Sequence, residues 1–118
     1  MIRKLEQKDK GDWAKLYNGY ADFYKVPMNA KILDTLWTWI HDKSHIVNGI
    51  CYELDGKIVG IAHYRTMPRP IKGKYICFLD DLFVEPDFRC QKIAQKLIGH
   101  LKSLSKTNNW DGIRWITH

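Results

Sequence analysis

Residues 78–101 read "FLDDLFVEPDFRCQKIAQKLIGHL", and this stretch decides the fold. It begins with an apolar run that contains two adjacent aspartates, which indicates a β-strand. A short basic and polar loop follows, and apolar residues then recur at the three- and four-residue spacing of a helix. A strand that leads into a helix through a tight loop directs unpaired backbone N–H groups and the positive end of the helix dipole to one place, which suits a phosphate group.

The rest of the chain alternates between strand and helix patterns. We expect strands over residues 1–5, 49–54, 57–66, 75–84 and 112–118, and helices that begin at Asp9 or Asp12, at Asn29 and near Gln91. Pro27 should end the first helix, and residues 67–74, "MPRPIKGK", should form a loop. The dipeptide Asp55-Gly56 predicts a two-residue hairpin turn, because it suits positive φ angles.

Each predicted helix has an apolar face. In the second helix, that face should comprise Ile32, Leu33, Leu36, Trp37 and Ile40. The predicted order β-α-α-β-β-β-α-β gives an α/β (α+β) fold class, with a mixed sheet that has helices on both faces.

Composition limits the function classes. The 118 residues, 45% of them hydrophobic, suit one domain over residues 1–118. Three cysteines without C-x-x-C spacing favour free thiols over a disulfide framework or a zinc site, and no metal site is predicted.

The sequence has no signal peptide or membrane-spanning run, so we expect a cytoplasmic protein with no membrane partner. A formal charge of +6 favours anionic ligands, but the absence of a nucleic-acid motif argues against a nucleic-acid partner.

The loop resembles the motif of a known superfamily. Residues 89–94, "RCQKIA", are similar to the pattern Q/R-x-x-G-x-G/A with which the GCN5-related N-acetyltransferases wrap the pyrophosphate of acetyl-CoA. "YADFYKV", "ELDGKIVGIAHYR", "FLDDLFVEPDFR" and "RWITH" resemble the branch related to yeast histone and polyamine acetyltransferases. The resemblance covers essentially the whole chain and implies a mostly antiparallel sheet.

The resemblance implies acetyl-CoA (CoA) as the coenzyme and assigns its contacts. Arg89 would meet a pyrophosphate oxygen, and the amides of residues 91–95 would bind the phosphates. The strand before the loop would pair with the pantetheine arm. The predicted cofactor-binding residues are Leu82, Phe83, Val84, Arg89, Cys90, Gln91, Lys92, Ile93, Ala94 and Gln95.

Two features depart from the family pattern. Lys92 stands where the pattern has glycine, and its side chain could block the approach of the backbone to the diphosphate or could add a charge contact. The family continues beyond the strand represented by "RWITH", whereas this sequence stops at His118. We therefore expect the C-terminal helix and final strands to be missing, together with the tyrosine that in many members protonates the thiolate. A natural short form, a fragment and a binding remnant are all compatible with this pattern.

The acid that accepts the proton of the substrate amine should lie on the strand before the loop. Asp81 is the first candidate and Asp80 the second, because adjacent strand residues point to opposite faces and one of them should face the substrate. A salt bridge to a lysine is the alternative role for Asp80, and Glu85 is a third candidate. In the family the first two helices border the acceptor site, so Tyr20 or Tyr24 is expected to touch substrate.

The predicted function is acetyl-CoA-dependent N-acetyl transfer to a primary amine of a small molecule or protein. The alternative is a catalytically deficient CoA-binding or protein-interaction domain of the same fold. We also expect a homodimer, because the strand around Arg114 would leave an open edge beside apolar Trp115.

Overall fold

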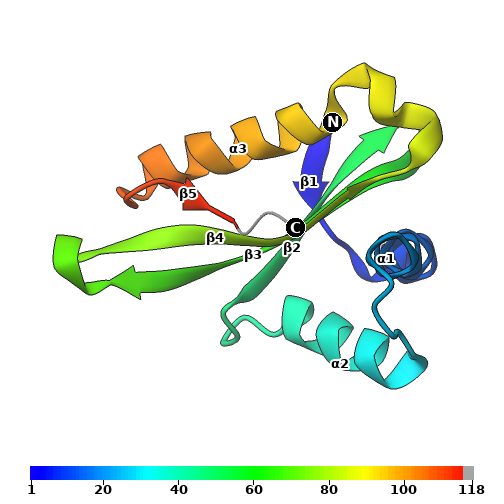
Figure 1. Cartoon of the computed structure of the whole chain (residues 1–118), viewed down its shortest axis with the longest axis horizontal. Coiled ribbons are helices and arrows are strands. Elements are labelled where there is room, and N and C mark those ends of the chain that lie inside the picture. The colour runs from blue at the N-terminus through cyan, green and yellow to red at the C-terminus, as the bar shows by residue number, and fades with distance from the viewer. Residues whose placement is uncertain (116–118) are drawn as a thin grey trace.

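The computed structural model describes residues 1–115, and its elements follow the predicted order (Figure 1). The strands are β1 Ile2–Lys4, β2 Val47–Leu54, β3 Lys57–Arg69, β4 Lys74–Val84 and β5 Ile113–Arg114, and the helices are α1 Lys10–Tyr24, α2 Ala30–His41 and α3 Ile93–Thr107. Short 3-10 turns occupy Gln7–Asp9, Pro70–Lys72 and Pro86–Gln91. The predicted α/β (α+β) class is confirmed.

The strands form a mixed sheet in the order β1-β2-β3-β4-β5. The first four strands are antiparallel, and β5 pairs with β4 in parallel. Asp55 and Gly56 join β2 to β3 with φ angles of 52° and 77°, as the hairpin prediction requires.

Helices cover both faces of the sheet (Figure 1). Helix α3 buries Ile93, Leu97 and Leu101 against one face, whereas α1 and α2 bury Trp13, Leu16 and Trp37 against the other. Neighbouring strand residues divide between the two cores, because successive side chains of a strand alternate between faces. Ile61 belongs to the core under α1 and α2, and Ala62 to the core under α3.

The helix ends follow local sequence signals. The Asn29 side chain accepts a hydrogen bond from the Ile32 amide at 2.9 Å, which caps α2 as predicted. Asp9 precedes α1, but its carboxylate accepts two hydrogen bonds from the Arg3 guanidinium and does not cap the helix. Helix α1 ends before Pro27, with Lys25 in the left-handed conformation.

The predicted loop at residues 67–74 is wrong over half of its length. Strand β3 continues to Arg69, and β4 begins at Lys74. Pairing of β2 with β3 starts at Arg65, so the part of β3 around Pro68 has no β2 neighbour. Proline is tolerated there because the hydrogen-bond donor that it lacks faces an unpaired edge. Gly73, with a φ of 63°, then completes the turn of this long hairpin.

The predicted final strand is confirmed at Ile113–Arg114. Residues 116–118 lie outside the described residues, and so does half of the predicted subunit contact at residues 114–117. Trp115 is 46% exposed. Within residues 1–115, no helix is long and apolar enough to cross a membrane.

Candidate active site

A β-bulge in β4 creates the first half of the site. His63 of β3 pairs with Asp81, but the next residue, Tyr64, pairs with Leu79, so Asp80 is the extra residue of the bulge. Leu79 and Leu82 therefore face the same core, under α3. The prediction that only one of the two aspartates could face a substrate is wrong, because the bulge interrupts the alternation and both aspartates line one cavity.

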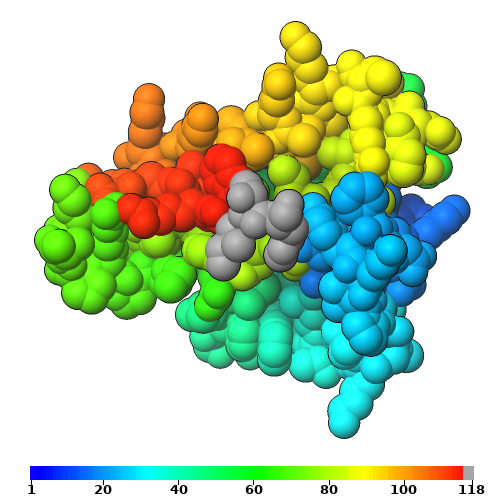
Figure 2. Space-filling model, viewed as in Figure 1, coloured from blue at the N-terminus to red at the C-terminus, as the bar shows by residue number. Residues whose placement is uncertain are grey.

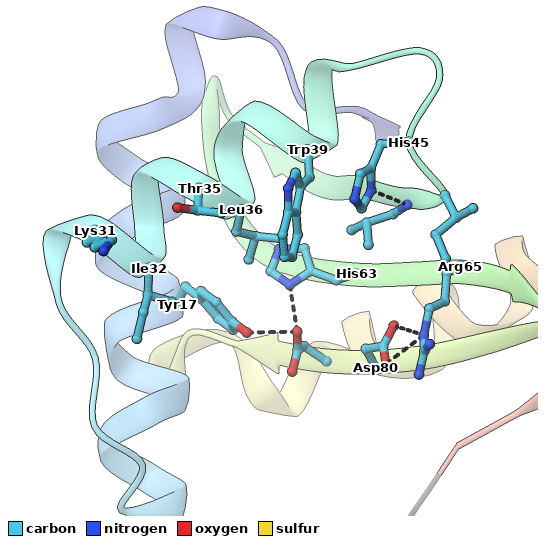
Figure 3. A pocket seen from close by; sticks show the side chains of 13 residues that line it. Tyr17, Lys31, Ile32, Thr35, Leu36, Trp39, His45, His63, Arg65 and Asp80 are labelled. Atoms are coloured by element: carbon cyan, nitrogen blue, oxygen red, sulfur yellow. Dashed lines mark hydrogen bonds and ion pairs between the residues drawn. The ribbon is translucent and has the colours of Figure 1, made fainter.

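That cavity, called the acceptor cavity below, has a volume of about 690 Å³ and lies between β3, β4 and one side of α2 (Figure 3). Asp80, Asp81, His63 and Tyr17 contribute its polar part. Its apolar wall includes Ile32, Leu36, Trp39, Ile46 and Val47.

A hydrogen-bonded chain holds Asp81 in the acceptor cavity. His63 Nδ1 lies 2.8 Å from Asp81 Oδ2, and the Tyr17 hydroxyl donates to the same oxygen at 2.9 Å. Behind His63, the buried Trp13 indole donates from Nε1 to His63 Nε2 at 2.8 Å. An indole N–H can only donate, so Nε2 carries no proton and the neutral imidazole donates from Nδ1 to Asp81.

These hydrogen bonds control the charge of Asp81. Burial raises the pKa of the Asp81 carboxyl, but hydrogen bonds from His63 and Tyr17 act in the opposite direction and hold the pKa below its ordinary value. Burial, reinforced by the Asp81 charge, raises the pKa of the Tyr17 hydroxyl, so the tyrosine keeps its proton as a donor. Asp81 is thus an ionised carboxylate with an orientation fixed by α1 and β3, as a proton acceptor requires.

Asp80 has a different environment. Arg65 donates from Nε to both of its carboxylate oxygens, at 3.1 and 3.2 Å. Burial raises the pKa of the Asp80 carboxyl, and the Arg65 hydrogen bonds reduce that shift. Asp80 thus forms a salt bridge, as its alternative role predicts, but its partner is an arginine and not the expected lysine.

A second cavity, called the coenzyme cavity below, follows directly along β4. It has a volume of about 430 Å³ and is lined by Phe23, Tyr24, Leu82, Phe83, Val84, Arg89, Lys92, Ala94 and Gln95. Seven of these residues are among the ten predicted to bind the cofactor. The loop and α1, far apart in sequence, lie side by side at the surface (yellow and blue in Figure 2).

Two basic residues define the loop of the coenzyme cavity. Arg89 donates from Nε to the Val84 carbonyl at 3.0 Å, and its guanidinium lies over the rings of Phe23 and Phe83 at 5.5 and 5.2 Å. Lys92 has a φ of 58°, in the left-handed region that favours glycine. This conformation explains why glycine suits the corresponding position of the family motif.

The start of α3 presents unpaired amides to the coenzyme cavity. The Lys96 amide donates to the Lys92 carbonyl at 3.1 Å. The amides of residues 93–95 come before this bond in the sequence, so they have no carbonyl partner within the helix. Within residues 1–115, β5 pairs with β4 only at Cys77 and Phe78. Among the described residues, no strand therefore pairs with the outer backbone edge of residues 82–84, where Arg89 occupies the Val84 carbonyl and the other outward-facing groups are available to an extended ligand.

The remaining predicted residues lie near these cavities in different ways. Cys90 and Gln91 are exposed, while the Ile93 side chain is buried in the core. Tyr24 lines the coenzyme cavity, and the Tyr20 ring stacks on Tyr17 with centroids 5.5 Å apart. Glu85, the third candidate for the proton acceptor, does not line the acceptor cavity. Its carboxylate forms an ion pair with Lys57 at 3.6 Å.

Sequence reasoning missed Tyr17 and His63 as partners of Asp81, and Trp13 as the partner of His63. Tyr17 and His63 lie 64 and 18 residues from Asp81, and Trp13 lies 50 residues from His63. The available signal was a polar histidine inside the strand pattern "KIVGIAHYRT". A buried histidine requires hydrogen-bond partners.

The comparisons with known proteins agree with this geometry. The sequence profile of the acetyltransferase (GNAT) family matches residues 13–117. The chain is 23% identical to the D-amino-acid N-acetyltransferase HPA3 of Saccharomyces cerevisiae (strain ATCC 204508 / S288c), over 99% of this chain and 74% of the relative.

Solved structures share the fold. A ribosomal-protein-alanine N-acetyltransferase from Brucella melitensis biovar Abortus 2308 has a TM-score of 0.83 at 23% identity and covers 98% of this chain and 78% of its own. A possible acetyltransferase from Clostridium difficile 630 has a TM-score of 0.86 at 17% identity and covers 100% of this chain and 79% of its own. The chain belongs to the acetyltransferase (GNAT) family. Acyl transfer is the general chemistry of this family.

Proposed function

We propose that this protein is an acetyl-CoA-dependent N-acetyltransferase that acts on a primary amine. One observation carries the proposal: Asp81 lines the acceptor cavity, and the next residue, Leu82, lines the coenzyme cavity. An amine held by Asp81 is thereby placed beside the backbone edge that suits a pantetheine arm. Family membership supports acyl transfer in general.

The residues of the coenzyme cavity fit acetyl-CoA. The amides of residues 93–95 and the Arg89 guanidinium provide donors for a diphosphate, and the open edge of residues 82–84 provides donors and acceptors for the amide groups of a pantetheine. The coenzyme supplies an acetyl group as a thioester.

The chain's own residues act on the amine. Asp81 holds the incoming ammonium group and accepts its first proton, which frees the nitrogen lone pair to form the C–N bond; the second proton that the nitrogen loses passes to the thiolate released as the C–S bond breaks. The hydrogen bonds from His63 and Tyr17 both end on Oδ2, and Tyr20 is a further donor to the carboxylate; because each carboxylate oxygen has two lone pairs, Asp81 can still accept from the substrate nitrogen. His63 and Tyr17 are positioning residues, since they act through Asp81.

Thiol release from acetyl-CoA, measured with a panel of primary amines, tests the proposal. We expect amine-dependent release above the background rate. The panel includes D-amino acids, because the yeast relative carries D-amino-acid N-acetyltransferase in its name. Coenzyme binding without release by any amine would contradict transfer.

A CoA-binding module without turnover is the second candidate. The left-handed conformation of Lys92 favours it, because a side chain stands there where the family motif has glycine. Calorimetry separates the cases: binding of CoA by Lys92→Gly but not by the native chain would identify an altered site. Failure of both proteins to bind at millimolar concentration would contradict the coenzyme assignment.

A homodimer with Trp115 at or near the contact remains our proposal for assembly, and exposed Trp115 supports it. Light scattering after size exclusion should give a dimer that Trp115→Lys weakens. A monodisperse monomer unaffected by that change would contradict it.

A further inference from the structure

We infer that the acceptor is a monoamine with an apolar body, such as an arylalkylamine, and that α2 selects it over polyamines and lysine side chains. This inference rests on the proposed function, because it names the substrate class of the same site. The argument uses the two apolar stripes of α2 and the charges that line the acceptor cavity.

Helix α2 has more apolar surface than the core uses. Leu33, Trp37 and Ile40 recur at helical spacing and pack against the sheet. A second stripe, Ile32, Leu36 and Trp39, has the same spacing and lines the acceptor cavity, and Leu36 also packs against the core (Figure 3). The expectation that Ile32 would belong to the core face is therefore wrong.

The second stripe is open to a ligand. Ile32 and Trp39 are each 42% exposed, although both are large apolar side chains. The Trp39 ring is held in place by stacking on His45, with centroids 4.7 Å apart and planes 9° apart. A rigid aromatic wall next to aliphatic side chains suits a flat or branched apolar group.

The charges of the acceptor cavity suit one ammonium group. Asp80 is bound by Arg65, and the hydrogen bonds of His63 mark it as neutral. Asp81 is therefore the lining carboxylate without a cationic partner among the described residues. Lys31 also lines the cavity, and its positive charge would repel the second ammonium group of a polyamine.

The position of Asp81 explains how the two features act together. Figure 3 shows Ile32, Leu36 and Trp39 projecting from α2 toward the side of the cavity occupied by Tyr17 and His63. His63 and Tyr17 both bind Asp81, so an amine on Asp81 has its carbon substituent next to the apolar stripe. Burial of that substituent favours binding in proportion to its apolar area.

Steady-state kinetics with 2-phenylethylamine, methylamine and spermidine tests this inference. We expect kcat/KM for phenylethylamine to exceed that for each of the other two amines by at least about tenfold. Trp39→Ala should raise KM for phenylethylamine by about tenfold, with kcat and the methylamine KM almost unchanged. Ile71→Ala is the control, because Ile71 is 86% exposed at the tip of the long hairpin and outside the cavity; it should change neither constant.

The outcomes separate this inference from the proposed function. Preferential acetylation of spermidine, unaffected by Trp39→Ala, would overturn the inference and uphold N-acetyl transfer. If no amine is acetylated, calorimetry with the same amines decides. Tighter binding of phenylethylamine that depends on Trp39 would uphold the inference while transfer fails, and equal or tighter binding of spermidine would overturn it.

Discussion

The two parts of β4 that border the cavities are built in opposite ways. At Asp81, three side chains from α1 and β3 fix one carboxylate through a continuous chain of hydrogen bonds. At the coenzyme cavity, a local loop and a helix start present backbone amides, and Lys92 holds a conformation that costs free energy. Long-range contacts therefore organise the proposed chemistry, whereas local backbone geometry organises the proposed coenzyme site.

The largest expected effect comes from Asp81→Asn. This change removes the proton acceptor and should lower kcat/KM for an amine by about 10²–10⁴-fold. Asp80→Asn is the matched control and should have a much smaller effect, because Asp80 is bound by Arg65. Equal and small effects of both substitutions would show that neither carboxylate accepts the proton.

Trp13→Phe tests the outermost bond of the hydrogen-bonded chain. The change leaves buried His63 Nε2 without its donor, and we expect a loss of about 1–3 kcal/mol in the free energy of unfolding, measured by urea denaturation. Transfer activity should also fall, with an altered pH profile, because the histidine no longer has a fixed tautomer.

Trp37→Phe is the control for that experiment. Trp37 also donates from its indole, at 3.0 Å to Gln7 Oε1, but Gln7 is exposed and can bind water instead. We expect a smaller loss of stability and no change in the pH profile. If Trp13→Phe and Trp37→Phe had the same loss of stability and the same pH profile, the hydrogen bond from Trp13 to His63 would have no special role behind Asp81.

Lys92→Gly tests the coenzyme cavity, which local backbone geometry organises. Glycine adopts the left-handed conformation without a Cβ clash, so we expect the free energy of unfolding to rise by roughly 0.5–1 kcal/mol and CoA to bind more tightly. Lys102→Gly, in the exposed interior of α3, should instead lower stability by about 1 kcal/mol. Changes of the same sign in thermal melts would contradict the strain assigned to Lys92.

The smallest expected effect is on the pH dependence of stability. The pKa of Asp81 is lower in the folded protein than in the unfolded chain, so the ionised carboxylate stabilises the fold above its unfolded pKa. That stabilisation is lost as pH falls through the folded pKa. The groups facing Asp81 are His63, Tyr17, Tyr20 and Asp80.

Melting curves from pH 6 down to pH 3 measure this effect. The native protein should lose stability on acidification more steeply than Asp81→Asn, which lacks the titrating group. Parallel curves would contradict the lowered pKa.

Local features of the fold could be predicted from the sequence. The Asp55-Gly56 turn and the Asn29 cap depend on residues that are neighbours in the chain. The bulge at Asp80 could not be predicted, because it depends on how His63 and Tyr64 pair with a strand that begins several residues later. The strand through Pro68 escaped prediction for the same reason, since its tolerance depends on where β2 ends.

The candidate site shows the same contrast between local features and long-range contacts. Residues of the loop motif, such as Arg89 and Ala94, line the coenzyme cavity as a local pattern predicted. The assignment of His63 and Tyr17 as donors to Asp81 required the packing of α1 on β3 and β4. Tyr17 lies outside the segments that carry the family resemblance, and His63 lies inside one of them without a role assigned to it.

The central claim is that the two cavities together transfer an acetyl group to an amine. Mass spectrometry of a reaction containing acetyl-CoA and 2-phenylethylamine tests it most directly. The account predicts one N-acetylated amine for each CoA released, with Asp81→Asn binding CoA as tightly as the native chain but forming almost no product. Binding of CoA with no acetylated amine above the protein-free background, or full activity in Asp81→Asn, would contradict the account.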